Sequence, residues 1–467
     1  MTGVIEEKQP VDVYEQEASQ NKIINEEFKI WKKAVPTFYK HISTFKPRFA
    51  KNVSHQSKVH QTVVFTDKVF PDRAQGTLTT SVLYALGSNI YEIDVMLPLG
   101  VHLESSEGAI PGQPVYDLFL KTFDETQFEP KWTVGNDTVE KLVLLNSNGI
   151  KFAALTSHGS VMWFKDEIST PKTQCLAEPS ENGAKVTVDF DVSTDMSSVL
   201  LMSSSSKEDE SSKSVTTTTT VKIIDNKETV GDIKRIFKIS DIPEQCVSCS
   251  FVSGADVAAL CFADGSVKLW DLSKSLDTPA WTLADTLDGK LTLFKTSGLI
   301  PTLFATGSDN GTIKLWDWRT LQSQPTIEVG KAGSEGNSKK LRELVRLTHY
   351  ENDAVVDIIF SDTSACKLIT VGATGNVYHW DLSFVFSHES MGEDDDESFD
   401  DAVLESECLS FYHTGGYRRA IGNVAGSQRN SVTAHTVVDD LTCCVDADGL
   451  ISVYIPFTAR IESDTSE

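Results

Sequence analysis

The sequence predicts an all-β fold of repeated antiparallel sheets, because one pattern of strand, turn and strand recurs along the chain. The clearest copies are CFADGSVKLWDL at 261–272, ATGSDNGTIKLWDW at 305–318 and VGATGNVYHWDL at 371–382. Each has an apolar segment, a turn containing Asp-Gly, Asn-Gly or Thr-Gly, and an alternating segment that closes on Trp-Asp, which is the signature of a β-hairpin. Repeats of this form, with a period of roughly 40 to 45 residues, predict a WD-repeat β-propeller.

Weaker copies of the pattern raise the number of predicted blades to seven. In these copies a small residue precedes an alternating segment that ends on an aromatic or apolar anchor, as in TSHGSVMWFKD and DADGLISVYIP. The predicted anchors are Ile93, Phe164, Ile224, Trp270, Trp316, Trp380 and Tyr454. Asp271, Asp317 and Asp381 follow the three tryptophans and are expected to fix turns, while the tryptophans pack between sheets. Each sheet needs its neighbours to bury its faces, so the ring should close as one domain.

The predicted organisation is one propeller with two tails, a helix and insertions. In chain order we expect a disordered tail, a helix packed on the propeller, a seven-bladed propeller and a C-terminal tail, over 1–20, 21–46, 47–457 and 458–467. Hydrophilic insertions interrupt the propeller near 203–220, 328–340 and 387–407. The first insertion, SSSSKEDESSKSVTTTTT, contains few apolar residues and predicts a flexible hairpin loop.

Charge and composition limit the classes of partner and compartment. The formal net charge is −25 at pH 7, so the surface should repel phosphate backbones and attract basic polypeptides. Acidity that only aids solubility is the alternative. The N-terminus is acidic where a signal peptide needs an apolar core, and no segment is apolar over the length of a membrane span. The eight cysteines show no disulfide spacing. We therefore expect a cytosolic or nuclear protein, and neither nucleic acid nor membrane as a direct partner.

No motif predicts catalysis or a cofactor. The sequence has no phosphate-binding loop, dinucleotide fingerprint or nucleophile-base signature, so a propeller enzyme with a site in its channel is only the remote alternative. Cys246 and Cys249 form a CxxC pair, but no second pair has zinc spacing and residues three apart in a strand point to opposite faces, which favours packing. Three histidines near strand ends are expected to hydrogen-bond within blades: His158, His379 and His435.

An amphipathic helix is predicted ahead of the propeller, in IINEEFKIWKKAVPTFYKHI at 23–42. Asn25 can cap its start. Apolar residues recur at helical spacing in Ile24, Phe28, Trp31 and Val35. Pro36 breaks or kinks the helix, after which Phe38, Tyr39 and Ile42 predict a further apolar turn.

The run INEEFKIWKK, the nearby proline and the Phe38-Tyr39 pair resemble the N-terminal helix of the retinoblastoma-associated, histone-binding WD-repeat proteins. Members of that family are shared subunits of histone deacetylase, histone acetyltransferase, chromatin-assembly and Polycomb complexes. The acidic insertion after Trp380 and the return LSFYHTGGYRR at 409–419 are also similar to the family. The chain lacks the family's Trp-Pro-Ser-Leu-Thr entry into the first blade and the paired prolines of its acidic loop. It looks most like a divergent fungal branch that represses unscheduled meiotic genes within class I histone deacetylase complexes.

The resemblance implies a partner site between the helix and the acidic insertion. In the family a basic histone helix lies between these two elements, with apolar contacts on one side and charge pairing on the other. Here Phe38 and Tyr39 would supply the apolar contacts. The carboxylates would come from Glu393, Asp394, Asp395, Asp396, Glu397, Asp400 and Asp401. A solvated linker is the alternative reading of this acidic stretch, and the missing prolines indicate a partner other than the usual histone helix.

These observations and the resemblance predict a non-catalytic interaction subunit of a nuclear histone deacetylase corepressor complex. Its partners would be a class I histone deacetylase, corepressor scaffold subunits, and histone tails or helices. Modest contacts would gain strength through tethering within the complex. A histone chaperone acting in chromatin assembly is the alternative.

Overall fold

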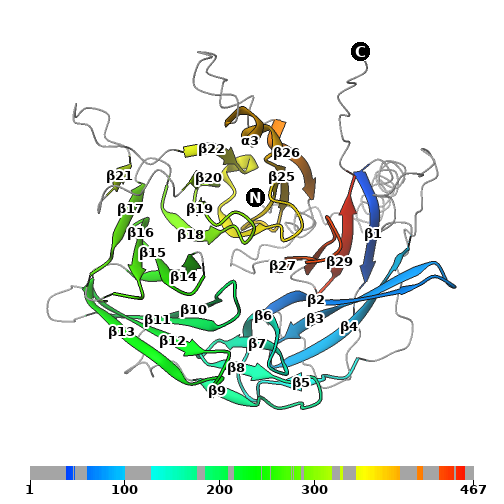
Figure 1. Cartoon of the computed structure of the whole chain (residues 1–467), viewed down its shortest axis with the longest axis horizontal. Coiled ribbons are helices and arrows are strands. Elements are labelled where there is room, and N and C mark those ends of the chain that lie inside the picture. The colour runs from blue at the N-terminus through cyan, green and yellow to red at the C-terminus, as the bar shows by residue number, and fades with distance from the viewer. Residues whose placement is uncertain are drawn as a thin grey trace, which may run out of the picture.

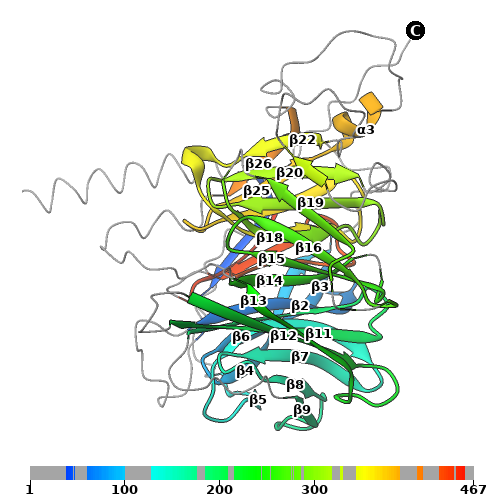
Figure 2. The ribbon, with the colours of Figure 1, turned by 90° about the vertical axis from the view of Figure 1, so that its left-hand side faces the viewer.

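The computed structural model is a closed ring of seven β-sheets (Figure 1), shown from the side in Figure 2, and a cavity lies at its centre. The predicted seven-bladed propeller is therefore confirmed. The structure describes residues 38–45, 47, 60–99, 128–175, 185–208, 215–242, 245–252, 254–274, 276, 278–285, 289–317, 327–329, 343–389, 407–413, 431–445 and 449–457. Within this part of the chain no helix is long and apolar enough to cross a membrane.

Blades I to III follow one another along the chain, with their strands in sequence order. Blade I contains β2 (Gln61–Asp72), β3 (Thr77–Leu86), β4 (Asn89–Pro98) and β5 (Trp132–Thr133). Blade II contains β6 (Val139–Ser147), β7 (Ile150–Thr156), β8 (Val161–Phe164) and β9 (Thr173–Cys175). Blade III contains β10 (Lys185–Val192), β11 (Ser198–Glu208), β12 (Val215–Asp225) and β13 (Ile233–Ile242).

Blades IV to VI continue this order. Blade IV contains β14 (Cys246–Val252), β15 (Val257–Phe262), β16 (Ser266–Asp271) and β17 (Trp281–Asp285). Blade V contains β18 (Leu291–Thr296), β19 (Leu303–Ser308), β20 (Thr312–Asp317) and β22 (Glu343–Thr348). The 3-10 helix η2 (Tyr350–Asn352) leads into blade VI, which contains β23 (Val355–Phe360), β24 (Lys367–Gly372), β25 (Val377–Asp381) and β26 (Leu409–His413).

Blade VII joins the two ends of the described chain and closes the ring. Its first three strands are β27 (Ser431–Ala434), β28 (Thr442–Val445) and β29 (Ile451–Pro456), and its fourth is β1 (Tyr39–Phe45), which pairs antiparallel with β29. The first and third strands of every blade run in the same direction. We call the face at which they end the exit face.

The prediction of helical structure up to Ile42 is wrong, because residues 39–45 form strand β1. Pro36 disfavours helix for the residues around it, and the aromatic and β-branched residues that follow suit a strand. Pairing with the edge of β29 stabilises the extended conformation of these residues. The local sequence does not reveal this pairing, because β29 lies at the other end of the chain. Residues 21–37 of the predicted helix lie outside the described residues.

All seven predicted anchors are confirmed as core residues. Each lies in the third strand of its blade and has at most 2% of its surface exposed. Seven apolar clusters fill the seven junctions between blades, and every anchor faces the blade that precedes its own. For example, Trp316 packs on Leu269 of blade IV, while its neighbour Leu315 packs towards blade VI.

The predicted flexible loop at 203–220 is largely a pair of strands. Ser203 to Ser206 of β11 pair with Thr220 to Thr217 of β12. The hydroxyl groups of Ser204 and Thr219 are 2.9 Å apart, and the Ser204 hydroxyl accepts the backbone N–H of Cys246 in blade IV. Hydroxyl side chains that satisfy one another can extend a sheet, so the polar composition misled the prediction. Residues 209–214 lie outside the described part of the chain.

The other two predicted insertions are each fixed to the ring at their ends. Near the second, β21 (Ile327–Val329) pairs in parallel with β17 and so adds a fifth strand to blade IV. The third begins with helix α3 (Ser383–Glu389), in which Val385 is buried at the junction of blades V and VI, and it ends at the buried Cys408.

Candidate functional site

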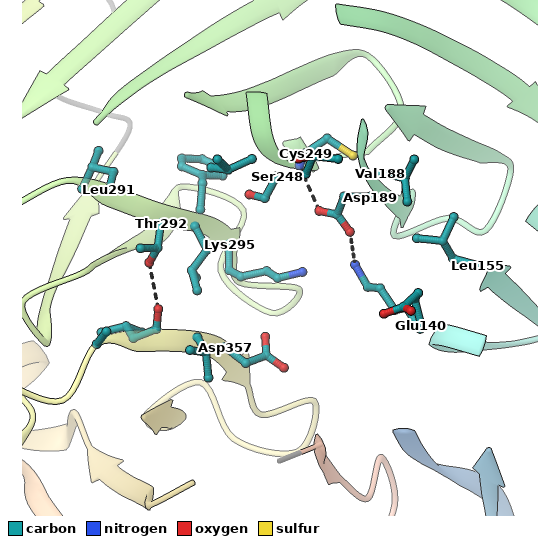
Figure 3. A pocket seen from close by; sticks show the side chains of 18 of the residues that line it. Glu140, Leu155, Val188, Asp189, Ser248, Cys249, Leu291, Thr292, Lys295 and Asp357 are labelled. Carbon is teal, nitrogen blue, oxygen red and sulfur yellow. Dashed lines mark hydrogen bonds and ion pairs between the residues drawn. The ribbon is translucent and has the colours of Figure 1, made fainter. Parts of the chain in front are cut away.

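The central channel contains a cavity of about 610 Å³. First strands from all seven blades line it, and Figure 3 shows charged side chains projecting into it from several of them. Cavities of roughly 300 to 1,000 Å³ are typical of small-molecule sites. The channel is therefore large enough to hold a small ligand or a side chain of a partner.

One residue of each first strand contributes to a belt around this cavity. In each blade the anchor lies opposite one residue of the second strand. The belt residue is the first-strand residue that pairs with the second strand three positions further along the chain. The belt consists of Thr62, Lys141, Asp189, Ser248, Leu293, Asp357 and Ser431. Equivalent positions thus carry a cation, two carboxylates, three hydroxyl groups and one apolar side chain.

Two pairs of neighbouring belt residues bond to each other, Lys141 with Asp189 and Thr62 with Ser431. Lys141 Nζ lies 2.9 Å from Asp189 Oδ1 and donates to the carbonyl oxygen of Phe190 at 2.6 Å. The second oxygen of Asp189 accepts the backbone N–H of Cys249 at 3.0 Å. Burial alone would lower the pKa of Lys141, but the carboxylates of Asp189 and Asp191 outweigh it and hold that pKa above its usual value. Lys141 is therefore a fixed cation and not a general base.

Asp357 and Lys295 are two of the charged groups of the cavity for which the described residues provide no ion pair. Asp357 accepts the backbone N–H of Ile358 at 2.9 Å, and burial raises the pKa of its carboxyl group. Figure 3 shows the Lys295 amine and the Asp357 carboxylate directed into the open space. Both groups are positioned to meet a polar ligand.

The predicted partner-binding residues Phe38 and Tyr39 have different surroundings. Phe38 is 53% exposed at the start of β1, where its carbonyl oxygen accepts the N–H of Phe457, itself 50% exposed. The Tyr39 hydroxyl bonds His413 Nδ1 at 2.8 Å, and its ring packs edge-on against Phe411 and Tyr454. The Tyr39 ring therefore packs between blades VI and VII, and its contact with a partner stays a prediction.

The predicted acidic residues from Glu393 to Asp401 lie outside the described residues, but both ends of their insertion are placed. The insertion leaves the third strand of blade VI through α3 and returns through Cys408. Phe38 adjoins the end of the third strand of blade VII. The start of the acidic insertion and Phe38 therefore lie on the exit face of adjacent blades.

The two cysteines of the CxxC pair are buried in β14, where burial raises the pKa of each thiol. No group of three or more His, Cys, Asp or Glu residues that could hold a metal ion occurs among the described residues. Two of the three histidines bond between blades and not within one: His379 bonds the Tyr454 hydroxyl of blade VII at 3.0 Å, and His435 bonds Thr80 of blade I at 3.1 Å. His158 does bond within its own blade, to Asp137 just before β6, although its side chain is 82% exposed.

The sequence prediction missed the channel belt. Its residues are scattered along the chain, and their types follow no motif. A positional signal does exist, because Lys141, Leu293, Asp357 and Ser431 each precede the anchor of their blade by 23 residues. The long β2–β3 and β11–β12 hairpins lengthen this interval in blades I and III, and the short turn between β14 and β15 reduces it by one residue in blade IV.

No protein-family model matches the chain. It is 33% identical to the transcriptional regulatory protein UME1 of Saccharomyces cerevisiae, over 96% of this chain and 97% of UME1. It is 35% identical to the transcriptional modulator WTM2 of the same yeast, over 92% of this chain and 95% of WTM2. Identity to the transcriptional modulator WTM1 is 31%, over 93% of this chain and 99% of WTM1.

The ring, its anchors and its channel define the chain as a WD-repeat β-propeller. It belongs to the family of fungal WD-repeat transcriptional regulators that includes UME1, WTM1 and WTM2. The fungal branch expected from the sequence is thereby confirmed, and the chain has a role in transcriptional regulation.

Proposed function

We propose that the chain is a non-catalytic scaffold and histone- or peptide-binding subunit of a nuclear histone deacetylase corepressor complex that represses transcription. The main observation in support is that the exposed Phe38 lies on the exit face, one blade away from helix α3, where the acidic insertion starts. An apolar contact beside a run of carboxylates would suit a segment that is apolar on one side and basic on the other. Similarity to transcriptional regulators over almost the whole chain supports the regulatory setting.

The channel chemistry also favours binding over catalysis. Lys141 and Asp189 neutralise each other, and the Asp189 carboxylate is further occupied by a backbone N–H. A general base must be free to accept a proton near the working pH, which these two groups are not. Asp357 and Lys295 can instead hold a polar group of a ligand in place.

Affinity purification of the full-length chain from its own cells, with identification of the bound proteins, tests the proposal. We expect a class I histone deacetylase and a corepressor scaffold to co-purify in stable amounts. Recovery of chromatin-assembly factors alone would support a histone chaperone instead. Deacetylase activity should follow the co-purified subunits and should be absent from the isolated chain.

Charge-reversal variants test whether peptide binding depends on the acidic insertion itself or only on the negative charge of the protein as a whole. Changing Asp394, Asp395 and Asp396 to lysine should abolish binding of a basic amphipathic histone peptide, and Phe38→Ala should weaken it. Lysine substitutions at Asp67, Asp94 and Asp256, three exposed carboxylates of blades I and IV, are the matched control. If the control weakens binding as much, the acidic insertion is not the specific site.

A further inference from the structure

Strand β13 forms an unusually long outer edge on blade III. It contains ten residues, whereas the outermost strands β5 and β9 of the preceding blades contain two and three. Among the described residues no strand pairs with its outer side. An uncovered edge strand presents backbone N–H and C=O groups to any segment that can lie alongside it.

The apolar junction between blades II and III opens to the surface at this edge. Four residues of one row face blade II, and their exposed fraction rises from the channel outward. The row runs through Phe190 (0%), Leu201 (1%), Lys222 (8%) and Ile236 (48%). Ile233, opposite the buried anchor Ile224, is 44% exposed. Because β9 is short, blade II covers the inner part of this row and leaves the outer part open.

The exposed edge is also basic, in a protein with a net charge of −25. Lys234, Arg235 and Lys238 are all exposed, and no acidic residue lies between Ile233 and Ser240. Lys234 pairs with Asp225 at 2.7 Å and Arg235 donates to the backbone carbonyl oxygen of Leu272 in blade IV, while all three basic side chains stay exposed to solvent. A segment that carries carboxylates between apolar residues would match both features of the edge.

The neighbouring blade shows that a blade edge of this protein accepts an added strand. Strand β21, which comes from the connection between two strands of blade V, pairs in parallel with β17 over Ile327 to Val329. Backbone pairing there covers the outer edge of blade IV. The equivalent edge of blade III has no such cover within the described ranges.

We infer that β13 is a docking edge for an extended segment of a partner protein in which apolar and acidic residues alternate. The segment would add a strand to blade III, place its apolar side chains on Ile233 and Ile236, and direct its carboxylates, on the opposite face of the added strand, towards Arg235. Main-chain hydrogen bonds would supply affinity, and alternate side chains would supply specificity. This surface is distinct from both the channel and the acidic insertion.

The test uses the full-length chain and a fluorescent, end-blocked peptide of four Glu-Val repeats. Fluorescence anisotropy should detect binding, and hydrogen exchange of backbone amides in β13 should slow when the peptide is present. Ile236→Glu should weaken binding by about tenfold or more, as expected for a charge placed at the centre of an apolar contact. Leu299→Glu, at an apolar residue of similar exposure (46%) on blade V, is the matched control.

Two further peptides distinguish strand addition from simple charge attraction. A Lys-Val repeat should not bind, and a Glu-Val peptide interrupted by proline should lose affinity because it cannot pair along the edge. The inference is overturned if the Glu-Val peptide does not bind, if Ile236→Glu binds it as tightly as the parent chain, or if the proline peptide binds equally well. Concentration-dependent self-association that Ile236→Glu abolishes would assign the edge to a second copy of this chain and would also overturn it.

Discussion

The hydroxyl group of Thr370 joins two buried side chains of blade VI. Trp380 Nε1 donates to it at 2.8 Å, and His349 Nε2 lies 2.7 Å from it. Blade V keeps half of this arrangement, since Trp316 Nε1 donates to Thr306 at 2.9 Å. Blade IV has Leu260 ten residues before its tryptophan, and Trp270 Nε1 is buried without a hydrogen-bond partner in the described structure. The indole N–H groups of the three tryptophans therefore differ in hydrogen bonding, although the three rings occupy equivalent positions in their blades.

Thr370→Val should destabilise the fold more than Thr306→Val. The first change deprives two buried polar groups of a partner and the second deprives one, at a cost of about 1 to 3 kcal/mol for each group. Urea unfolding monitored by tryptophan fluorescence measures the difference. Thr370→Ser, which retains the hydroxyl group, is the control and should recover most of the loss. Equal losses for both valine variants would contradict the shared role of the Thr370 hydroxyl.

Two buried histidines make the fold sensitive to acid. Burial lowers the pKa of His349 to about 4, and burial together with the nearby His413 and Lys367 lowers the pKa of His379 to about 3. In the unfolded chain both take up a proton near pH 6.5. Their contribution to stability is therefore complete above pH 6.5 and is lost as the pH falls towards these lower values.

The free energy of unfolding should consequently fall between pH 6.5 and pH 4, by up to about 1.4 kcal/mol per pH unit for each histidine. Urea titrations across this range measure the slope. His349→Gln should reduce this slope, because glutamine takes up no proton in the unfolded chain. A slope that is identical in the parent and in His349→Gln would show that His349 does not contribute.

At the scale of single elements, β1 is the strand whose side chains fasten the closure of the ring. Tyr39 contacts residues of both blade VI and blade VII, and Ile42 packs in the same junction. The next residue towards the N-terminus, Phe38, is exposed. Tyr39 therefore packs in the core of the ring, whereas the adjacent Phe38 faces solvent.

Substitutions at these adjacent residues should differ in their effect on stability. Tyr39→Phe removes the hydroxyl bonded to His413 and should cost roughly 0.5 to 1.5 kcal/mol, while Phe38→Ala should stay within about 0.5 kcal/mol. Thermal unfolding followed by circular dichroism provides the comparison. A larger loss for Phe38→Ala would mean that its ring packs on the protein in solution.

The sequence predicts the elements that local chemistry defines and misses those that distant pairing defines. Turn residues and alternating segments lie side by side in the chain, so the third strand of each blade and its anchor could be recognised. Strand β1 depends on β29 at the other end of the chain, and the extension of β11 and β12 depends on hydroxyl groups that pair across the sheet. The channel belt depends on register in seven blades at once. No single segment contains that information.

At the scale of the whole molecule, the ring has no free end. Each junction between blades is filled by an apolar cluster, and the cluster between blades VII and I has the same form as the others. Loss of one blade would expose two clusters to water. The seven sheets should therefore unfold together, although each has its own hydrogen bonds.

Ile93→Ala in blade I and Trp380→Ala in blade VI should each lower one common unfolding transition. Large-to-small changes at buried sites cost about 2 to 5 kcal/mol, and the closed ring should share that loss. Tryptophan fluorescence and far-ultraviolet circular dichroism should report the same midpoint in each variant. Two separated midpoints in either variant would show that part of the ring unfolds independently.

Closure by β1 also determines how long the newly made protein stays incomplete. Thr44 of β1 lies beside Ser452 of β29, 408 positions further along the chain. At about 5 to 20 residues per second, a ribosome needs roughly 20 to 80 s to cover that distance. During this time an aromatic-rich strand waits without its partner, beside an open ring of incomplete blades. Every molecule therefore passes through an interval in which β1 can pair either with its own ring or with a neighbouring nascent chain.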